Sequence, residues 1–286
     1  IPPMRINTLS IKQANLNIQT PHGQLKLTRF QFKAANIALN QIFSYQLAFN
    51  LSGKVNKNRF NTQVDLKGKA KVDDAQLFNN QPLNAVDLKG ALTLDKLRYN
   101  KVIVDKVDSD LSLINANFTF NLKSLSAYKG QAKGKFNYDY HKKTMNADVD
   151  ISKVDLGPLL LALNNMKMLQ GRFTGQLSLN SVGKTGNQLL KDLNGKANVK
   201  VQKGKLVAID VNGFIRWLDK LIGKKRAVID YLSKIGKEIK EKKHFSKKPT
   251  PFNFLSGQAV IKKGVVSTQD IKMDTGRLSV NGEARG

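Results

Sequence analysis

The sequence contains no cysteine, and this absence removes several classes of protein at once. Disulfide-stabilised scaffolds, zinc sites built on thiolates and cysteine nucleophiles all need a residue that the chain lacks. Histidine is also scarce: His22, His141 and His244 lie in polar or charged surroundings and share no motif. No metalloprotease, phosphate-loop, dinucleotide-binding or nucleophile-elbow motif is present. We therefore predict that the protein is not an enzyme and uses no cofactor or metal.

Long hydrophobic runs are missing as well. No stretch approaches the ~20 consecutive apolar residues that a membrane-spanning helix requires, and no signal-peptide pattern opens the chain. The first residue is Ile1 rather than methionine, so we interpret the chain as a fragment or a processed form. We expect any anchor or signal to lie upstream of it.

Acidic residues are few, because 21 Asp and Glu stand against 48 Lys and Arg, for a net charge of +27. Such a charge suits nucleic acid, an anionic membrane surface or a generally basic proteome. The basic residues are spread along the whole chain, which argues against a single basic tail. No nucleic-acid-binding module is recognisable, and packing inside a sheet explains the aromatic residues better than base stacking does. We predict no nucleic-acid partner.

Apolar and polar residues alternate over most of the chain. Leu16 and Ile18 alternate with polar residues near the start, and Phe118 and Phe120 do so further on. A period of two places the apolar side chains on one face of a β-sheet and the polar ones on the other. The pattern predicts a mainly β protein built from antiparallel hairpins.

One phrase recurs through these strands: an apolar or aromatic residue, any residue, glycine, any residue, and a small or apolar residue. In a strand, glycine marks a bulge, a bend or a close approach of two backbones. Glycine is also common at strand starts in β proteins, but the recurrence favours a repeated strand unit. The glycines of the phrase are Gly53, Gly68, Gly90, Gly130, Gly171, Gly195, Gly257 and Gly282.

Two short helices interrupt the strands. Residues 158–166 are rich in leucine without alternation, Pro158 suits a first helical turn, and Asp155 precedes it as a possible cap. We expect these leucines to pack on the sheet or to plug one end of it. A second short helix is predicted over 187–193.

A longer basic helical segment is predicted over 210–243, with a joint near Gly223. From Arg216 to Lys248 it has twelve Lys or Arg against four acidic residues, a net +8. Such a segment either packs on its own sheet with its lysines in water or contacts a membrane. We predict that this segment caps or lids the end of the groove. Its sheet-facing residues would be Phe214, Trp217 and Leu218. Its residues facing solvent or anionic headgroups would be Lys224, Lys225 and Arg226.

Several phrases in order resemble the AsmA family of bacterial envelope proteins, most clearly over residues 145–286. Residues 1–144 are compatible only in their strand pattern, and Ala208 stands where the family usually has glycine. The phrases are Asp155-Leu-Gly-Pro-Leu-Leu, Leu169-Gln-Gly-Arg-Phe, Leu193-Asn-Gly-Lys-Ala, Lys203-Gly204-Lys205-Leu-Val-Ala-Ile209-Asp210, Thr250-Pro251-Phe252 and Lys263-Gly264-Val265-Val266.

The resemblance implies a protein of the Gram-negative periplasm, tethered to the inner membrane by an upstream helix. It also implies kinship with TamB-like proteins, whose long grooved sheets are thought to pass phospholipids between the membranes. AsmA itself was linked to outer-membrane protein assembly, and the family supplies no catalytic residues. Phospholipid acyl chains, an anionic membrane surface and other envelope proteins are the expected partners.

We therefore expect an elongated, twisted antiparallel sheet curled into an apolar groove, because a large exposed apolar face usually marks a binding site. Residues 1–150 would form a repeated strand region and residues 151–286 an AsmA-like C-terminal region. Two functions stay open: a groove that binds or transfers lipid, and a structural or assembly factor that binds envelope proteins. The predicted lipid-binding residues are Phe118, Phe120, Phe136, Tyr138, Val149, Ile151, Leu177, Leu179, Val199 and Val201.

Overall fold

The described strands of this computed structural model form one antiparallel sheet that is not closed into a barrel. The described residues are 5–21, 23–55, 58–77, 82–165, 167, 169–207, 226–227, 249–276 and 279–282. Mainly antiparallel β structure with a few short helices was predicted, and this is confirmed. The curling of the sheet into a groove stays a prediction.

The chain divides into two compact units. Unit 1 comprises residues 1–127 and 135–141, and unit 2 comprises residues 128–134 and 142–286. The predicted division at 150 and 151 falls inside a strand, and it stays a prediction.

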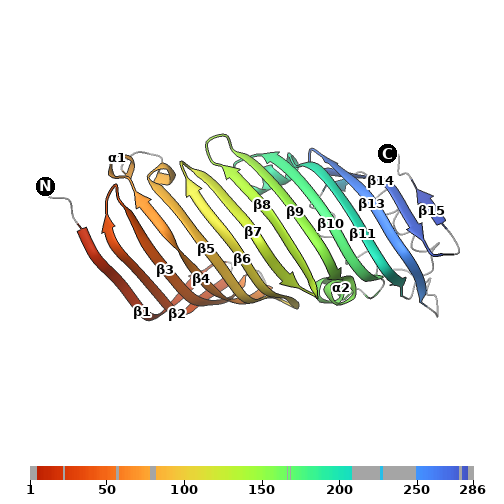
Figure 1. Cartoon of the computed structure of the whole chain (residues 1–286), viewed down its shortest axis with the longest axis horizontal. Coiled ribbons are helices and arrows are strands. Elements are labelled where there is room, and N and C mark those ends of the chain that lie inside the picture. Colours follow the sequence, from red (N-terminus) through yellow and green to blue (C-terminus); the bar gives the residue numbers. More distant parts are fainter. Residues whose placement is uncertain are drawn as a thin grey trace. The chain divides into compact units, whose positions relative to one another are not determined.

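Within unit 1, strands that follow one another in the sequence pair with one another (Figure 1). The strands are β1 (Arg5–Thr20), β2 (Gly23–Ala38), β3 (Ile42–Val55), β4 (Asn58–Val72), β5 (Val86–Tyr99), β6 (Val102–Ile114) and β7 (Asn117–Ala127). A four-residue helix, α1 (Asp74–Leu77), and a 3-10 turn, η1 (Pro82–Asn84), connect β4 to β5. The sequence pattern did not predict either of them.

Unit 2 continues the same hairpin order. Its strands are β9 (Thr144–Asp155), β10 (Leu169–Val182), β11 (Asn194–Leu206), β13 (Thr250–Lys262), β14 (Val265–Asp274) and β15 (Ser279–Gly282). A short strand β12 (Arg226–Ala227) pairs with one end of β14, and β15 pairs with the other end. Strand β8 (Gly130–Asp139) has residues in both units.

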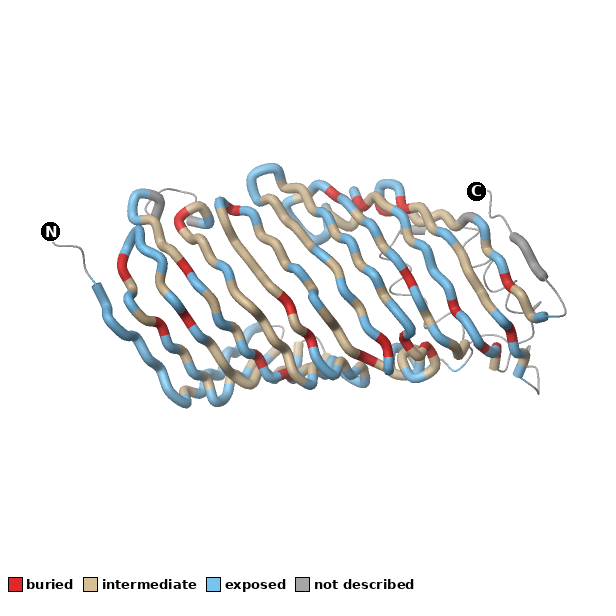
Figure 2. The backbone as a smooth tube through the Cα atoms, viewed as in Figure 1, coloured by how far each residue is buried: buried red, intermediate tan, exposed pale blue. Residues whose placement is uncertain are grey.

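The alternation in the sequence becomes an alternation of burial, as β4 shows. Thr62 and Val64 are buried, whereas Gln63 and Asp65 between them are exposed. Figure 2 shows the same alternation along most strands as buried or intermediate residues separated by exposed ones. Each unit therefore has one apolar face and one polar face.

Bulges interrupt the alternation near the middle of many strands. At each one, two residues of one strand oppose a single residue of its neighbour; Lys96 of β5 and Lys153 of β9 are examples. The extra residue has a positive φ, 51° at Lys96 and 55° at Lys153, and its side chain is exposed. A bulge bends the strand and increases its twist. Glycine was expected to mark such bends, but at these positions the extra residue is polar and not glycine.

Some of the recurring glycines have another role, since they make room for large side chains. A Cβ atom at Gly90 would lie 2.6 Å from the Tyr45 hydroxyl oxygen, and one at Gly53 would lie 3.0 Å from the Phe60 ring. The large side chain therefore lies over the glycine, an arrangement known from aromatic rescue of glycine in sheets. Close approach was one of the three roles predicted for the glycine phrase.

The two short helices lie close to the predicted places. Helix α2 (Leu156–Asn164) begins two residues before the predicted start, directly after Asp155, whose side chain makes no capping hydrogen bond. Helix α3 (Gly186–Lys191) begins one residue early, because Thr185 and Gln188 form a capping box. The helix predicted over 210–243 lies outside the described residues except at two positions.

At those two positions the prediction is wrong. Arg226 and Ala227 form β12 and pair with Val266 and Val265 of β14 instead of continuing a helix. The physical reason is that β14 presents backbone hydrogen-bonding groups along its outer edge, and a short strand satisfies part of them.

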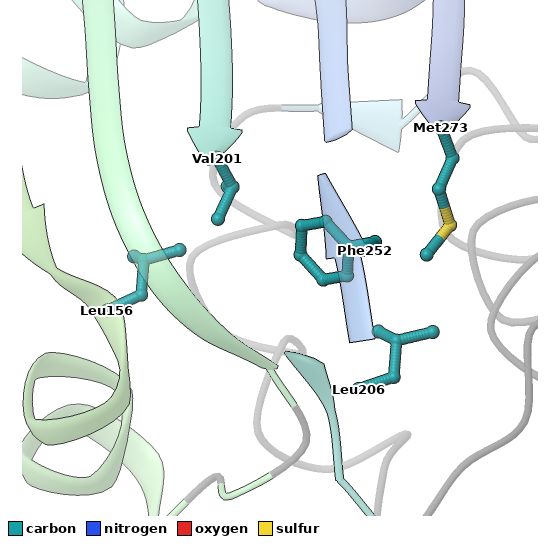
Figure 3. Close-up of a cluster of buried hydrophobic side chains, with 5 residues drawn as sticks. All are labelled: Leu156, Val201, Leu206, Phe252 and Met273. Atoms are coloured by element: carbon teal, nitrogen blue, oxygen red, sulfur yellow. The ribbon is translucent and has the colours of Figure 1, made fainter. Parts of the chain in front are cut away.

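A compact apolar cluster lies in unit 2 (Figure 3). Its members come from α2, β11, β13 and β14, and Leu206 is completely buried. They are Leu156, Val201, Leu206, Phe252 and Met273. Leu159 and Leu160 of α2 pack against the cluster, whereas Leu161 and Leu163 on the same helix are 42% and 53% exposed. The leucine-rich helix thus packs only one side on the sheet.

Replacing Gly204 by alanine should destabilise unit 2. The new Cβ would overlap the ring of Phe252, which is 3% exposed and cannot move away, and would lie 2.6 Å from the carbonyl oxygen of Gln170. Overpacking of this kind costs about 1–3 kcal/mol. Gly257→Ala on β13 is the matched control, because its nearest neighbour would be Ile271 Cγ1 at 3.7 Å. Urea unfolding of both variants measures the difference, and equal stability of the two would contradict the packing argument.

Candidate functional site

The apolar face of unit 1 is built from rows of side chains that run across the strands. In one row, register pairing joins Ile11 of β1, Phe32 of β2, Leu47 of β3, Leu66 of β4 and Leu92 of β5. Side chains directly opposite each other on one face are in contact distance. The row is therefore a continuous apolar strip five strands wide.

Tyr45 of β3 anchors this face. It packs with Ala34 and Ala70 in a buried cluster, and its hydroxyl donates a long hydrogen bond of 3.4 Å to the Lys89 carbonyl. Burial raises the pKa of the Tyr45 hydroxyl above its ordinary value. Phe32 and Phe43 pack against the same cluster.

Aromatic side chains occupy the face near β7 and the end of β8. Phe118 and Phe120 lie opposite Leu113 and Leu111 of β6. The Phe118 and Phe136 ring centroids are 6.2 Å apart in an edge-on arrangement. Phe136 and Tyr138 are two residues apart on β8, so they share a face. The four predicted residues of unit 1 therefore lie together on its apolar face.

The predicted residues of unit 2 also share one face. Val149 of β9 lies opposite Leu177 of β10, and Ile151 lies opposite Gly175. Val199 of β11 lies between Gly175 and Gly257 and is 39% exposed. Leu179 shares the face with Leu177 and lies opposite Gly195. These side chains form an apolar surface with shallow places at the glycines.

Val201 differs from the other predicted lining residues. It belongs to the buried cluster of Figure 3 and is only 5% exposed. Its side chain supports the end of the apolar surface from within. It therefore offers little area to a ligand.

Both apolar faces are open among the described residues. All described strands belong to one sheet, so no second sheet packs on either face, and helices α2 and α3 contact strand ends. On β1 the large apolar side chains are 39–45% exposed, as Figure 2 shows for the whole strand. These are Ile6, Leu9, Ile11, Leu16 and Ile18. Exposed apolar area of this extent is typical of a binding surface.

The polar faces hold charged and hydroxyl side chains in short hydrogen-bond networks. Asp108 lies 3.1 Å from the Lys106 ammonium and accepts hydrogen bonds from Thr93 and Ser124. The hydrogen bond from Lys106 is the main reason that the pKa of Asp108 is lowered. In unit 2, the amide of Asn253 lowers the pKa of Asp274 in the same way.

Several hollows among the described residues are lined mainly by polar side chains. One in unit 2, of about 660 Å³, lies among Asp150, Lys200 and Lys272, with Ile151 and Val199 contributing at its floor. Lys200 lies 5.4 Å from the centroid of the Phe254 ring. The apolar faces are extended surfaces, which suit a long ligand better than a compact one.

Most of the predicted lid lies outside the described residues. This applies to Phe214, Trp217, Leu218, Lys224 and Lys225. The remaining lid residue, Arg226, lies in strand β12. The lid and its membrane contact stay predictions.

The described parts of the chain meet the requirements of neither a metal site nor a membrane-spanning helix. Within them, no group of three His, Asp or Glu side chains is placed to hold a metal ion. None of the described helices combines the length and the apolar character needed to cross a bilayer. What the described arrangement can do is adsorb apolar molecules on one face and anions on the other.

Comparison with known families agrees with this architecture. The family model described as the AsmA family matches residues 7–271. The chain belongs to the AsmA family. The match extends well beyond the region of clearest resemblance, so the N-terminal AsmA strands belong to the family domain as well. Neither the comparison with curated proteins nor the comparison with solved structures gave a match.

The predicted set omitted the apolar face of β1 to β5. Phe32, Leu47, Leu66 and Leu92 form a row as continuous as any predicted one. The same alternation marks them in the sequence. A consistent use of that signal would have included them.

Lys106→Met should raise the pKa of Asp108 toward its ordinary value. A lowered pKa in the folded state stabilises the protein above the unfolded-state pKa, and this contribution is lost as pH falls through the folded-state pKa. The variant should therefore lose less stability on acidification than the wild type. Carboxyl NMR titration measures the pKa, with Lys123→Met, which removes the partner of Asp110, as control. If the pKa of Asp108 were the same in the Lys106 variant as in the wild type, its lowering would have a cause other than Lys106.

Proposed function

We propose that this AsmA-family protein binds phospholipid through the apolar faces of its sheet and holds or moves it between the inner and outer membranes. The observation that carries the proposal is an antiparallel sheet whose apolar rows are not covered by a second layer in the described structure. Family membership supports an envelope role. No chemical step is needed.

Acyl chains match the geometry of these rows. Each methylene removed from water contributes about 0.8 kcal/mol, so even partial contact along a chain holds it to the surface. Moving from one apolar row to the next exchanges one set of similar contacts for another, so the binding free energy changes little between positions. Headgroups remain in water throughout.

Family membership supports the proposed setting. The proposed location is the periplasm of a Gram-negative bacterium, with a tether to the inner membrane supplied by an upstream helix. A strongly basic chain, at net +27, is suited to work beside anionic membrane surfaces.

A second candidate is a structural or assembly factor that binds other envelope proteins. It is favoured by β1, the first strand in the order of the sheet, whose large apolar side chains are 39–45% exposed. An exposed strand of this kind can accept another strand through backbone hydrogen bonds. In this case the apolar face would contact protein instead of lipid.

A photocrosslinking amino acid at Phe120 should capture lipid, whereas one at the next residue, Asn121, should not. Phe120 is on the apolar face, and Asn121 is exposed on the polar face. Leu177 and Ser178 make the same comparison in unit 2. Mass spectrometry of the adducts from cells identifies what was captured. Protein adducts without lipid at Phe120 and Leu177 would overturn the lipid proposal and support the assembly factor.

Leu177→Asp should also lower the amount of phospholipid that copurifies with the protein. The charge would lie among apolar side chains and disfavour acyl chains there, while Thr174→Asp on the polar face, opposite Lys200, adds the same charge as a control. Lipid extraction and quantification measures the loss, and circular dichroism checks that both variants fold. Equal lipid content in the two variants would contradict a role for this face.

A further inference from the structure

The polar face of unit 1 contains two lysines directly opposite each other. Lys69 of β4 is the register partner of Lys89 of β5, and Lys67 lies two residues before Lys69 on the same face. All three are exposed. Like charges directly opposite each other destabilise an antiparallel pair.

Neighbouring positions on this face pair opposite charges instead. Lys71 lies opposite Asp87, and Asp95 lies opposite Lys106. Like charges also lie opposite each other at Lys54 and Arg59, between β3 and β4. The pair at Lys69 and Lys89 differs because it lines a hollow together with a third lysine, Lys67.

No carboxylate compensates the three lysines within the described residues. Asp110 also lines the hollow, but its Oδ1 is 2.7 Å from the Lys123 ammonium and is already paired. The ammonium groups of Lys67, Lys69 and Lys89 form no ion pair with described residues. The hollow thus has an excess of positive charge.

A hollow of about 480 Å³ lies among these lysines. The row that contains Lys69 and Lys89 continues to Ser112 of β6 and Thr119 of β7, which also line it. The Thr119 hydroxyl lies 2.9 Å from the Asn137 amide oxygen. The Ser112 hydroxyl adds a donor beside the ammonium groups.

The backbone beneath the two lysines is held in place. Gly68 and Gly90 approach so closely that a Cβ at Gly68 would lie 2.7 Å from the Gly90 Cα. From the apolar face, the Tyr45 hydroxyl donates to the Lys89 carbonyl. The stems of both lysines therefore start from a fixed position, although their ammonium groups lie in water.

We propose that this hollow binds a phosphate group through Lys67, Lys69 and Lys89, with Ser112 as a further donor. A phosphate has enough charge to offset the opposed lysines, and an ammonium group binds it as a point charge. The site lies on the face opposite the apolar rows, so it does not depend on the proposed lipid function. The phosphate can belong to a lipid headgroup or to a free phosphate compound.

Thermal unfolding of the whole chain tests the site with inorganic phosphate against chloride at constant ionic strength. Phosphate should raise the Tm of the wild type, because a ligand that binds only the folded state stabilises it. The double variant Lys69→Gln/Lys89→Gln should lose this shift. The control variant Lys196→Gln/Lys262→Gln in unit 2 removes the same charge from exposed strand positions. It should keep the phosphate-dependent rise in Tm.

The phosphate-free reference gives a second readout. Without phosphate, the Lys69→Gln/Lys89→Gln variant should unfold at the same Tm as the wild type or higher, because the like-charge pair is gone. Equal phosphate shifts in all three proteins, or no shift in the wild type, would overturn the proposal. A lower Tm of the variant in chloride would also count against the proposal, because the opposed lysines would then not be destabilising without phosphate.

Vesicles distinguish the two sources of phosphate. Binding to phosphatidylglycerol vesicles should weaken by roughly tenfold in the Lys69→Gln/Lys89→Gln variant and not in the Lys196→Gln/Lys262→Gln control, if the site holds a headgroup. Phosphatidylcholine vesicles set the uncharged background. A phosphate-dependent Tm shift together with equal vesicle binding assigns the site to a free phosphate compound.

Discussion

Apolar side chains in this protein pack mainly against those of the neighbouring strands, because all the described strands belong to a single sheet. Within the described structure, packing must be achieved within one layer of side chains. The glycines make this possible, since rings such as Phe173 and Phe252 lie over Gly175 and Gly204. Close-packed contacts therefore form without a second layer.

The same constraint leaves the candidate site available. In a two-layer fold, Ile11, Leu66 or Leu177 would be covered by facing side chains, and the apolar rows would be core. Here they stay partly exposed or intermediate, whereas the clusters around Leu206 and Tyr45 are buried as a core is. A ligand that supplies the missing apolar contacts would take the place of a second layer. Burial by a ligand is then the physical basis for lipid binding.

Much of the candidate site could be predicted because alternation is a local property. Phe118, Phe136, Val149 and Leu177 each share a face with apolar neighbours, as their period of two required. Bulges were missed, although Leu94-Asp95-Lys96-Leu97 contains a signal: two polar residues separate two apolar ones. Inserting one residue keeps both leucines on one face. Burial of Val201 could not be predicted, because it depends on α2, β13 and β14 meeting around it.

The sequence by itself determined the mainly β fold class, the apolar and polar faces of the sheet and the membership of the AsmA family. Each of these depends on residues close together in the chain. Only the tertiary structure decided which residues oppose one another across strands. Lys69 and Lys89 are separated by a connection with its own helical turns, so no local pattern places them side by side. Likewise, Arg226 became a strand because β14 offered backbone partners. Register is a long-range property, and it decides which charges and apolar rows meet.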